Sequence, residues 1–141
     1  MMKLLIPVDG SRSAIHAVQF AVQMLPMVCD LEAHLLNVQE KIDSWEVRSH
    51  MDTAEIADIQ RCRADESLKE AIGVLQEAGV KYQTHIGQGE ISATIAAFAE
   101  KLGCHQIVMG TRGMGALEGL LMGSVSTKVL NRVSIPVTLV K

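Results

Sequence analysis

Five of the chain's 11 glycines fall within the 14 residues from 110 to 123, where even spacing along 141 residues would place about one. Glycine lets the backbone approach a ligand more closely than a residue with a Cβ allows. The cluster follows an apolar run and leads into a segment of helical periodicity. Because N–H groups at a helix start bind phosphate well, this pattern indicates a phosphate site. A surface loop without a ligand stays open as the alternative.

Two familiar phosphate motifs are absent from this cluster. The sequence contains no G-x4-G-K-[ST], which excludes a P-loop NTPase. Gly113 and Gly115 begin a G-x-G, but Glu118 stands where the third glycine of a dinucleotide fingerprint belongs. About 20 residues follow the cluster, too few for a further βαβ unit with a ribose-binding acid.

Few other residues are spaced for chemistry. The histidines, which show neither HExxH nor paired spacing, are His16, His34, His50, His85 and His105. The cysteines, which form no CxxC pair, are Cys29, Cys62 and Cys104. We therefore expect neither a histidine metal site nor a dithiol motif. Glu118 is a candidate base for a water molecule, but it has no evident orienting partner.

Apolar segments of two periodicities must position these residues. Apolar runs predict buried strands over residues 3–8, 31–38, 106–109 and 135–140, and alternating apolar and polar residues predict a strand over 80–86. Apolar residues three and four apart predict helices from about residue 14, over 53–78, over 91–102 and over 124–132. Ser11 or Ser13 is expected to cap the first helix. Residues 39–52 have no clean period and are expected to form a loop or lid. The strict alternation of predicted strands and helices indicates one α/β domain over residues 1–141 with a parallel sheet.

Charge and composition exclude several partners. The net charge of −3 and only four aromatic residues argue against DNA and RNA. Residues 101–141 nevertheless carry five basic residues and one acid, which favours an anionic ligand there, although scattered solvated lysines explain the charge equally well. No apolar run approaches the roughly 20 residues of a membrane helix. An odd cysteine count without a secretory signal fits the reducing cytosol.

The spacing Gly110-x2-Gly113-x9-Gly123-Ser124 resembles the ATP-binding signature of the universal stress protein family. The flanking segments 107–110, 123–126 and 135–137 agree with the family pattern as well. Near the amino terminus, Leu5-Ile-Pro-Val-Asp-Gly-Ser11 resembles the family's first strand and loop, and Leu35-Leu-Asn-Val38 resembles its second strand. The resemblance covers the whole chain.

This resemblance implies an open, Rossmann-like sheet of five parallel strands in the order 3-2-1-4-5, with helices on both faces. Strands one and four would then be neighbours whose connections leave towards opposite faces. Ligands of such sheets bind outside the carboxyl ends of the strands at that point. Asp9 follows the first strand and Gly110 follows the run 106–109, so the topology and the family pattern indicate the same crevice.

The resemblance also implies a role for each residue of the site. Pro7, Val8 and Asp9 would face the adenosine, Val38 would meet the adenine through its backbone, and Met109 and Gly110 would line the ribose. Phosphates would lie between Arg112 and Gly113 on one side and the helix start, Gly123, Ser124, Val125 and Ser126, on the other. Asp9 is also the candidate ligand for Mg²⁺, which prefers carboxylate and phosphate oxygens. The alternatives are that Asp9, Ser124 and Ser126 merely cap helices.

Three positions depart from the usual family pattern. Asn37 stands where histidine is common, Gly89 where proline is common, and His105 where aspartate is common. None belongs to the phosphate signature, so the departures affect ligand preference and local stability rather than the nucleotide assignment.

We therefore expect a cytoplasmic protein that binds ATP or a related adenine nucleotide and passes its occupancy to a protein partner in a stress response. A slow Mg²⁺-dependent ATPase and a nucleotide-free interaction module are the alternatives. The missing P-loop lysine favours a binder over an enzyme, and the intact glycine signature argues against the nucleotide-free module. The apolar strand expected at 135–140 should form a sheet edge, which predicts a homodimer.

Overall fold

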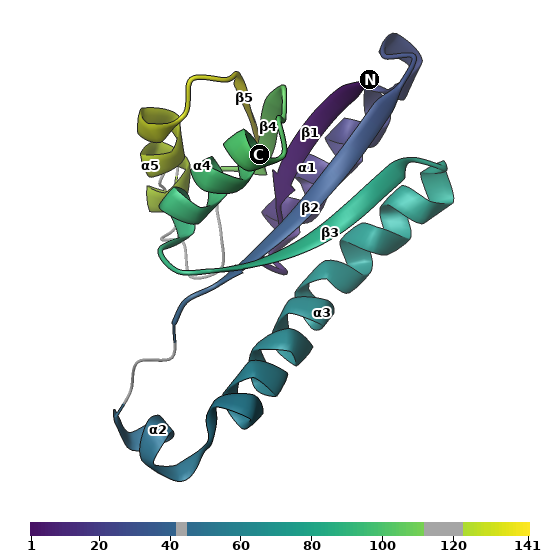
Figure 1. Cartoon of the computed structure of the whole chain (residues 1–141). Helices are drawn as coiled ribbons and strands as arrows, with labels where there is room; N and C mark the ends of the chain where they lie inside the picture. Colours follow the sequence, from purple (N-terminus) through teal and green to yellow (C-terminus); the bar gives the residue numbers. More distant parts are fainter. Residues whose placement is uncertain (42–44, 112–122) are drawn as a thin grey trace.

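The computed structural model describes residues 1–41, 45–111 and 123–141. Its five parallel strands form one sheet in the order β3-β2-β1-β4-β5, which confirms the expected topology (Figure 1). The strands are β1 (Met2–Pro7), β2 (Leu31–Gln39), β3 (Lys81–Gln88), β4 (Gln106–Gly110) and β5 (Val137–Val140).

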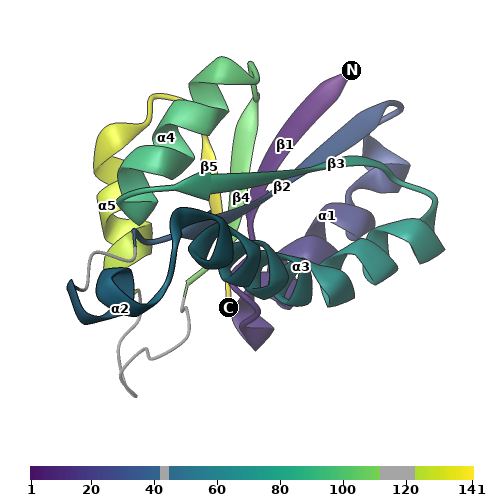
Figure 2. The ribbon, with the colours of Figure 1, turned by 60° about the horizontal axis from the view of Figure 1, so that its bottom comes forward.

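Helices cover both faces of this sheet. They are α1 (Arg12–Gln23), α2 (Trp45–His50), α3 (Thr53–Ala78), α4 (Ile91–Lys101) and α5 (Ser124–Arg132), with a 3-10 turn, η1 (Leu25–Met27), after α1. Figure 2 shows α1 and α3 on one side of the sheet and α4 and α5 on the other. None of the helices in the described parts of the chain is long and apolar enough to cross a membrane.

The core has two layers because neighbouring residues of a strand point to opposite faces. On β1, Leu4 and Ile6 pack with α1 and α3, whereas Leu5 packs with α4 and α5. On β2, Leu35 and Leu36 divide in the same way. All five side chains are fully buried, which explains the continuous apolar runs of these strands.

The structure corrects several expected boundaries. The segment 39–52, expected as a loop or lid, contributes its first residue to β2 and contains α2, which is too short to show a helical repeat in the sequence. β3 continues to Gln88 because backbone pairing with β2 needs no apolar side chain. β5 begins at Val137 rather than residue 135, although the carbonyl of Pro136 still accepts a hydrogen bond from Ile107 N–H at 3.0 Å.

Candidate functional site

The strand order reverses between β1 and β4, which are neighbours in the sheet. The chain leaves β1 for α1 on one face, and α5, which follows β4, packs on the other face. Such a reversal separates the two loops and opens a crevice at the carboxyl ends of the strands. Asp9 lies just after β1 and Gly110 ends β4, so the two sides of this crevice carry the residues expected there.

β2 forms one wall of the crevice because it is longer than its neighbour. The last register pair of β1 and β2 is Pro7 with Leu36, and Val8 N–H still donates to the Leu36 carbonyl at 2.8 Å. Val38 lies two residues farther along β2 and pairs with Gly87 of β3. Backbone groups two residues apart on a strand point the same way, so the backbone groups of Val38, like those of Leu36, face β1. Val38 lies beyond the last residue of β2 that pairs with β1.

A chain of side-chain amides joins the two strand ends. Asn37 is buried, and its Nδ2 donates to the carbonyl of Val8 at 2.8 Å. The Nε2 of Gln39 in turn donates to Asn37 Oδ1 at 2.5 Å. The sequence singled out Asn37 only as a departure from a family pattern and did not single out Gln39. The one available signal was two polar residues near the end of an apolar strand.

The turn after β1 is braced by two polar side chains. Ser11 caps α1, since its Oγ accepts from Ala14 N–H at 3.2 Å. Asp9 Oδ1 accepts from Ser11 N–H at 2.9 Å, so Asp9 supports the turn rather than capping the helix itself. Gly10 has a φ of +84°, a conformation that favours glycine. This turn places the Asp9 carboxylate at the carboxyl edge of the sheet.

The end of β4 packs tightly against α1. A Cβ on Gly110 would lie 2.2 Å from Ser13 Oγ and 2.7 Å from the Ser13 carbonyl carbon, so only glycine fits. The carbonyl of Gly110 accepts from Ser126 Oγ at 3.1 Å, which ties β4 to the first turn of α5. The side chain of Met109 is buried in the core, which leaves only its backbone to meet a ligand.

The start of α5 differs from the other long helices in how it is capped. Side chains of Ser11, Asp52 and Glu90 accept from the first N–H groups of α1, α3 and α4. Gly123 occupies this position in α5, and no side chain among the described residues caps it. Ser124 and Ser126 lie inside α5 rather than at its cap position. The hydroxyl of Ser126 donates to the Gly110 carbonyl of β4 instead. The α5 start thus offers N–H groups and the positive end of a helix dipole to an anion.

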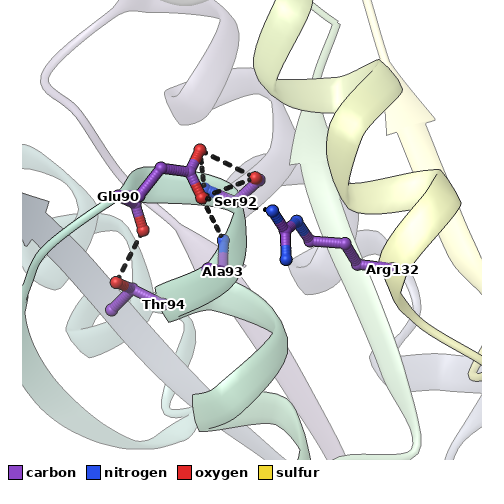
Figure 3. A network of polar contacts seen from close by, with 5 residues as sticks. All are labelled: Glu90, Ser92, Ala93, Thr94 and Arg132. Atoms are coloured by element: carbon purple, nitrogen blue, oxygen red, sulfur yellow. Dashed lines mark hydrogen bonds and ion pairs between the residues drawn. The ribbon is translucent and has the colours of Figure 1, made fainter.

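The other end of α5 is anchored to α4 (Figure 3). Arg132 Nη2 lies 3.9 Å from Glu90 Oε2. The same carboxylate accepts from the N–H groups of Ser92 and Ala93 and from Ser92 Oγ. The bonds from Ala93 N–H and Ser92 hold the pKa of the Glu90 carboxyl below its usual range. This ion pair joins the last turn of α5 to the start of α4.

A second opening lies on the α3 side of Asp9 and Gly10. It is a groove of about 720 Å³ whose lining includes Glu66, Glu70 and Glu77 of α3 and one basic residue, Lys69. Its acidic lining disfavours phosphate, in contrast to the start of α5. Among the described residues, no group of three histidine, cysteine or acidic side chains is arranged to hold a metal ion.

The structure therefore brings most of the expected residues to one edge. Pro7, Val8, Asp9, Val38, Met109 and Gly110 lie at or just beyond the carboxyl ends of β1, β2 and β4, and Gly123, Ser124, Val125 and Ser126 form the start of α5. The expected phosphate contacts Arg112 and Gly113, like the candidate base Glu118, lie outside the described residues.

Comparison with known proteins gives an independent view of the fold. A model of the universal stress protein family matches residues 1–141. A universal stress protein of Methanocaldococcus jannaschii is 31% identical over 147 residues, which span 99% of this chain and 81% of that protein. The solved structure of the hypothetical protein MJ0577 has a TM-score of 0.85 at 27% identity and covers 99% of this chain and 95% of its own.

Two similar solved structures hold adenine nucleotides. A family member from Arabidopsis thaliana with AMP bound has a TM-score of 0.72 at 18% identity, covering 100% of this chain and 92% of its own. A universal stress protein from Archaeoglobus fulgidus in complex with dAMP has a TM-score of 0.68 at 20% identity, covering 100% and 98%. At these identities the likeness shows a shared fold, and the nucleotides are properties of those two proteins.

Proposed function

Because the chain belongs to the universal stress protein family, we propose that it binds ATP or a related adenine nucleotide at the carboxyl edge of its sheet. One observation carries this proposal. The reversal of strand order between β1 and β4 lies at the same edge as a helix start without a side-chain cap. The first feature is where open α/β sheets bind ligands, and the second is suited to phosphate. The adenine nucleotides held by two proteins of the same fold support the choice of base.

The nucleotide would lie across the edge with its base near β2. Pro7, Val8 and Asp9 would face the adenosine, the backbone of Val38 the adenine, and Met109 and Gly110 the ribose. The phosphates would lie between Arg112 and Gly113 and the α5 start, Gly123, Ser124, Val125 and Ser126. There, backbone N–H groups, a hydroxyl and the Arg112 guanidinium would satisfy the phosphate oxygens.

Asp9 would be the protein ligand of a Mg²⁺ ion that arrives with the nucleotide. Its carboxylate lies at the crevice, and Mg²⁺ is commonly held by one or two carboxylates together with phosphate oxygens and water. The ion would neutralise phosphate charge close to the acidic groove on the α3 side.

The output of the site would be occupancy rather than hydrolysis. No P-loop lysine is present, and Glu118 has no evident orienting partner in the sequence. A bound nucleotide would favour one arrangement of the segments around the crevice and thereby change the affinity for a protein partner. The odd cysteine count favours the cytoplasm as the place of action. A slow ATPase and a nucleotide-free module are the competing functions.

The test is to denature the purified protein and identify any nucleotide that it releases. Adding ATP and Mg²⁺ and following phosphate release then separates a binder from an ATPase. Gly113→Val and Gly123→Val should abolish binding with the fold intact, because their side chains would fill the space of the phosphates. Gly123 has φ −73° and ψ 164°, a conformation that any residue adopts, so backbone strain would not explain a loss of binding by Gly123→Val. Normal ATP binding by both variants would show that the site is wrongly assigned.

We also expect two copies of the chain to pair through β5. This strand lies at one edge of the sheet, and an apolar edge strand has backbone groups that can pair with another chain.

A further inference from the structure

The amides of Asn37 and Gln39 replace the hydrogen bond that would otherwise continue the sheet. In a parallel ladder, Val8 would donate to Leu36 and accept from Val38 N–H. The first of these bonds is present at 2.8 Å. The carbonyl of Val8 instead accepts from Asn37 Nδ2, also at 2.8 Å, and no bond joins it to Val38 N–H within the described parts of the chain. The ladder therefore ends at the wall where the proposed base would lie.

The carbonyl of Val8 determines which end of each amide donates and which end accepts. A carbonyl oxygen only accepts, so the group that Asn37 presents to Val8 must be its NH₂. The other end of the Asn37 amide is then its oxygen, which accepts from Gln39. Gln39 must in turn use its NH₂ for this bond. What Gln39 has left is its side-chain carbonyl oxygen, Oε1, and the second N–H of Nε2, and the two cannot exchange places while Nε2 is bonded to Asn37.

Gln39 is the last residue of β2, so its amide lies at the carboxyl edge of the sheet. Asn37 and Gln39 are two residues apart on one strand, so their side chains share a face, and the Asn37 amide reaches across to β1. Gln39 follows it past the end of β1 and is only partly buried. The edge therefore presents a hydrogen-bond acceptor, Oε1, on an amide that the buried Asn37 holds through Nε2.

We propose that Gln39 determines base specificity by accepting a hydrogen bond from the exocyclic amino group of adenine, and that Asn37 is the positioning residue that orients it. This inference rests on the proposed nucleotide function. Adenine has an amino group at position 6, where guanine and hypoxanthine have a carbonyl oxygen. A fixed acceptor attracts the amino group of adenine and repels the carbonyl oxygen of guanine or hypoxanthine. Discrimination therefore comes from attraction of the right base and repulsion of the wrong ones.

The experiment compares four 5′-monophosphates by titration calorimetry: AMP, purine riboside monophosphate, IMP and GMP. Purine riboside monophosphate has the same sugar and phosphate as AMP but no 6-amino group. The wild type should bind AMP about three- to tenfold more tightly than this analogue, which is the value of one net hydrogen bond. IMP and GMP should bind more weakly than the analogue, because two acceptors would face each other.

Gln39→Met removes both ends of the amide and nearly keeps its length. It should bring the ratio of AMP to purine riboside monophosphate close to one without changing affinity for the analogue. Gln83→Met is the matched control, since Gln83 is an exposed glutamine of β3 that donates to Glu32 and should leave the ratio unchanged. Asn37→Leu should also lower the ratio. Asn37→His should restore it, because neutral imidazole has one donor for Val8 and one acceptor for Gln39.

The outcomes separate this inference from the proposed function. If the wild type binds none of the nucleotides, both fail. If it binds AMP and the analogue equally, or if Gln39→Met keeps the wild-type ratio, the proposed function stands and the role of Gln39 is wrong. If Gln39→Met does not fold, Asn37→Leu is the deciding variant, because the Val38 backbone also faces the adenine and a wild-type preference for AMP does not by itself identify Gln39.

Discussion

Gly110 and Gly123 belong to the same glycine signature but have different physical roles. Gly110 is required by packing, because any side chain would collide with Ser13 of α1. Gly123 has an ordinary backbone conformation and stands where the other long helices have a capping side chain. The first glycine therefore fixes the packing of β4 on α1, and the second leaves the start of α5 without a cap from any described side chain.

Gly110→Ala should destabilise the protein by about 1–3 kcal/mol, because overpacking forces β4 and α1 apart. The measurement is urea unfolding followed by circular dichroism. Gly73→Ala is the matched control, since Gly73 lies within α3 and nothing lies within 4 Å of its added Cβ. That variant should gain about 0.5–1 kcal/mol, as alanine does over glycine in a helix. Equal stability of the two variants would contradict the packing role of Gly110.

A second residue cluster, Glu32, His34 and His85, lies on the sheet face that carries α4. His34 Nδ1 is 2.9 Å from His85 Nε2, and His34 Nε2 is 2.8 Å from Glu32 Oε1. The contact with Glu32 has the distance of an ion pair but lacks hydrogen-bond geometry, which leaves this buried nitrogen poorly satisfied. Burial lowers the pKa of His85, and His34 and Lys101 lower it further.

The stability of the protein should therefore fall as the solution is acidified through the range of histidine titration. Because the pKa of His85 is lowered in the folded state, the unfolded chain binds the proton more readily. The stability that the folded protein has while His85 is neutral is therefore lost as pH falls. His85→Gln should reduce the change in unfolding free energy between about pH 7.5 and pH 5. His50→Gln, at an exposed position, should leave the wild-type profile in place. An unchanged profile for His85→Gln would refute the prediction.

Among the helices, α4 depends on a single carboxylate at its start. Glu90 accepts from Ser92 and Ala93 at the first turn and also meets Arg132 of α5. One side chain thus begins one helix and anchors another, so a change at Glu90 acts on both elements of that sheet face.

Glu90→Gln should lower the urea midpoint and should also remove part of the acid sensitivity of folding. The pKa of the Glu90 carboxyl is lowered in the folded state, so its contribution is present above the ordinary carboxyl range and is lost as pH falls through it. The measurement is the urea midpoint at neutral and acidic pH. Glu100→Gln, near the end of the same helix, is the control. A loss for Glu90→Gln no larger than the control's would show that the cap matters little.

The whole sheet has two edges, β3 and β5, and they differ in character. β3 carries mostly exposed or half-exposed polar residues, whereas β5 is short and apolar. The carbonyls of Pro136, just before β5, and of Val140 accept from Ile107 and Thr111, so the backbone groups of Val137 and Leu139 point outwards. These groups are the ones through which a second copy would extend the sheet.

Val137→Pro should convert the expected dimer into a monomer, because proline removes an outward N–H without removing a bond to β4. Sedimentation velocity at micromolar concentration measures the change. Val137→Ala is the control for lost packing and should stay dimeric. A wild type that sediments only as a particle of about 15 kDa, the mass of one chain, would exclude the dimer altogether.

Local patterns in the sequence predicted the elements well. The helices over 53–78 and 124–132 were predicted to the residue, because a capping residue or glycine and an apolar stripe mark their limits within a few residues of chain. The helix α2 was missed because six residues show no repeat, and the end of β3 was missed because its pairing depends on β2 rather than on its own side chains.

The resemblance to the family also predicted the strand order. This was possible because the spacing of the glycines and the alternation of strands and helices are both visible in the sequence. The amide chain from Gln39 through Asn37 to Val8 could not be read in the same way. The chain of amides forms because β2 extends beyond the last residue of β1 that pairs with it. That difference follows from the register between two strands about 30 residues apart in the sequence. Periodicity reports on neighbours along the chain, whereas hydrogen-bond polarity at the crevice follows from which backbone groups the folded sheet leaves opposite one another.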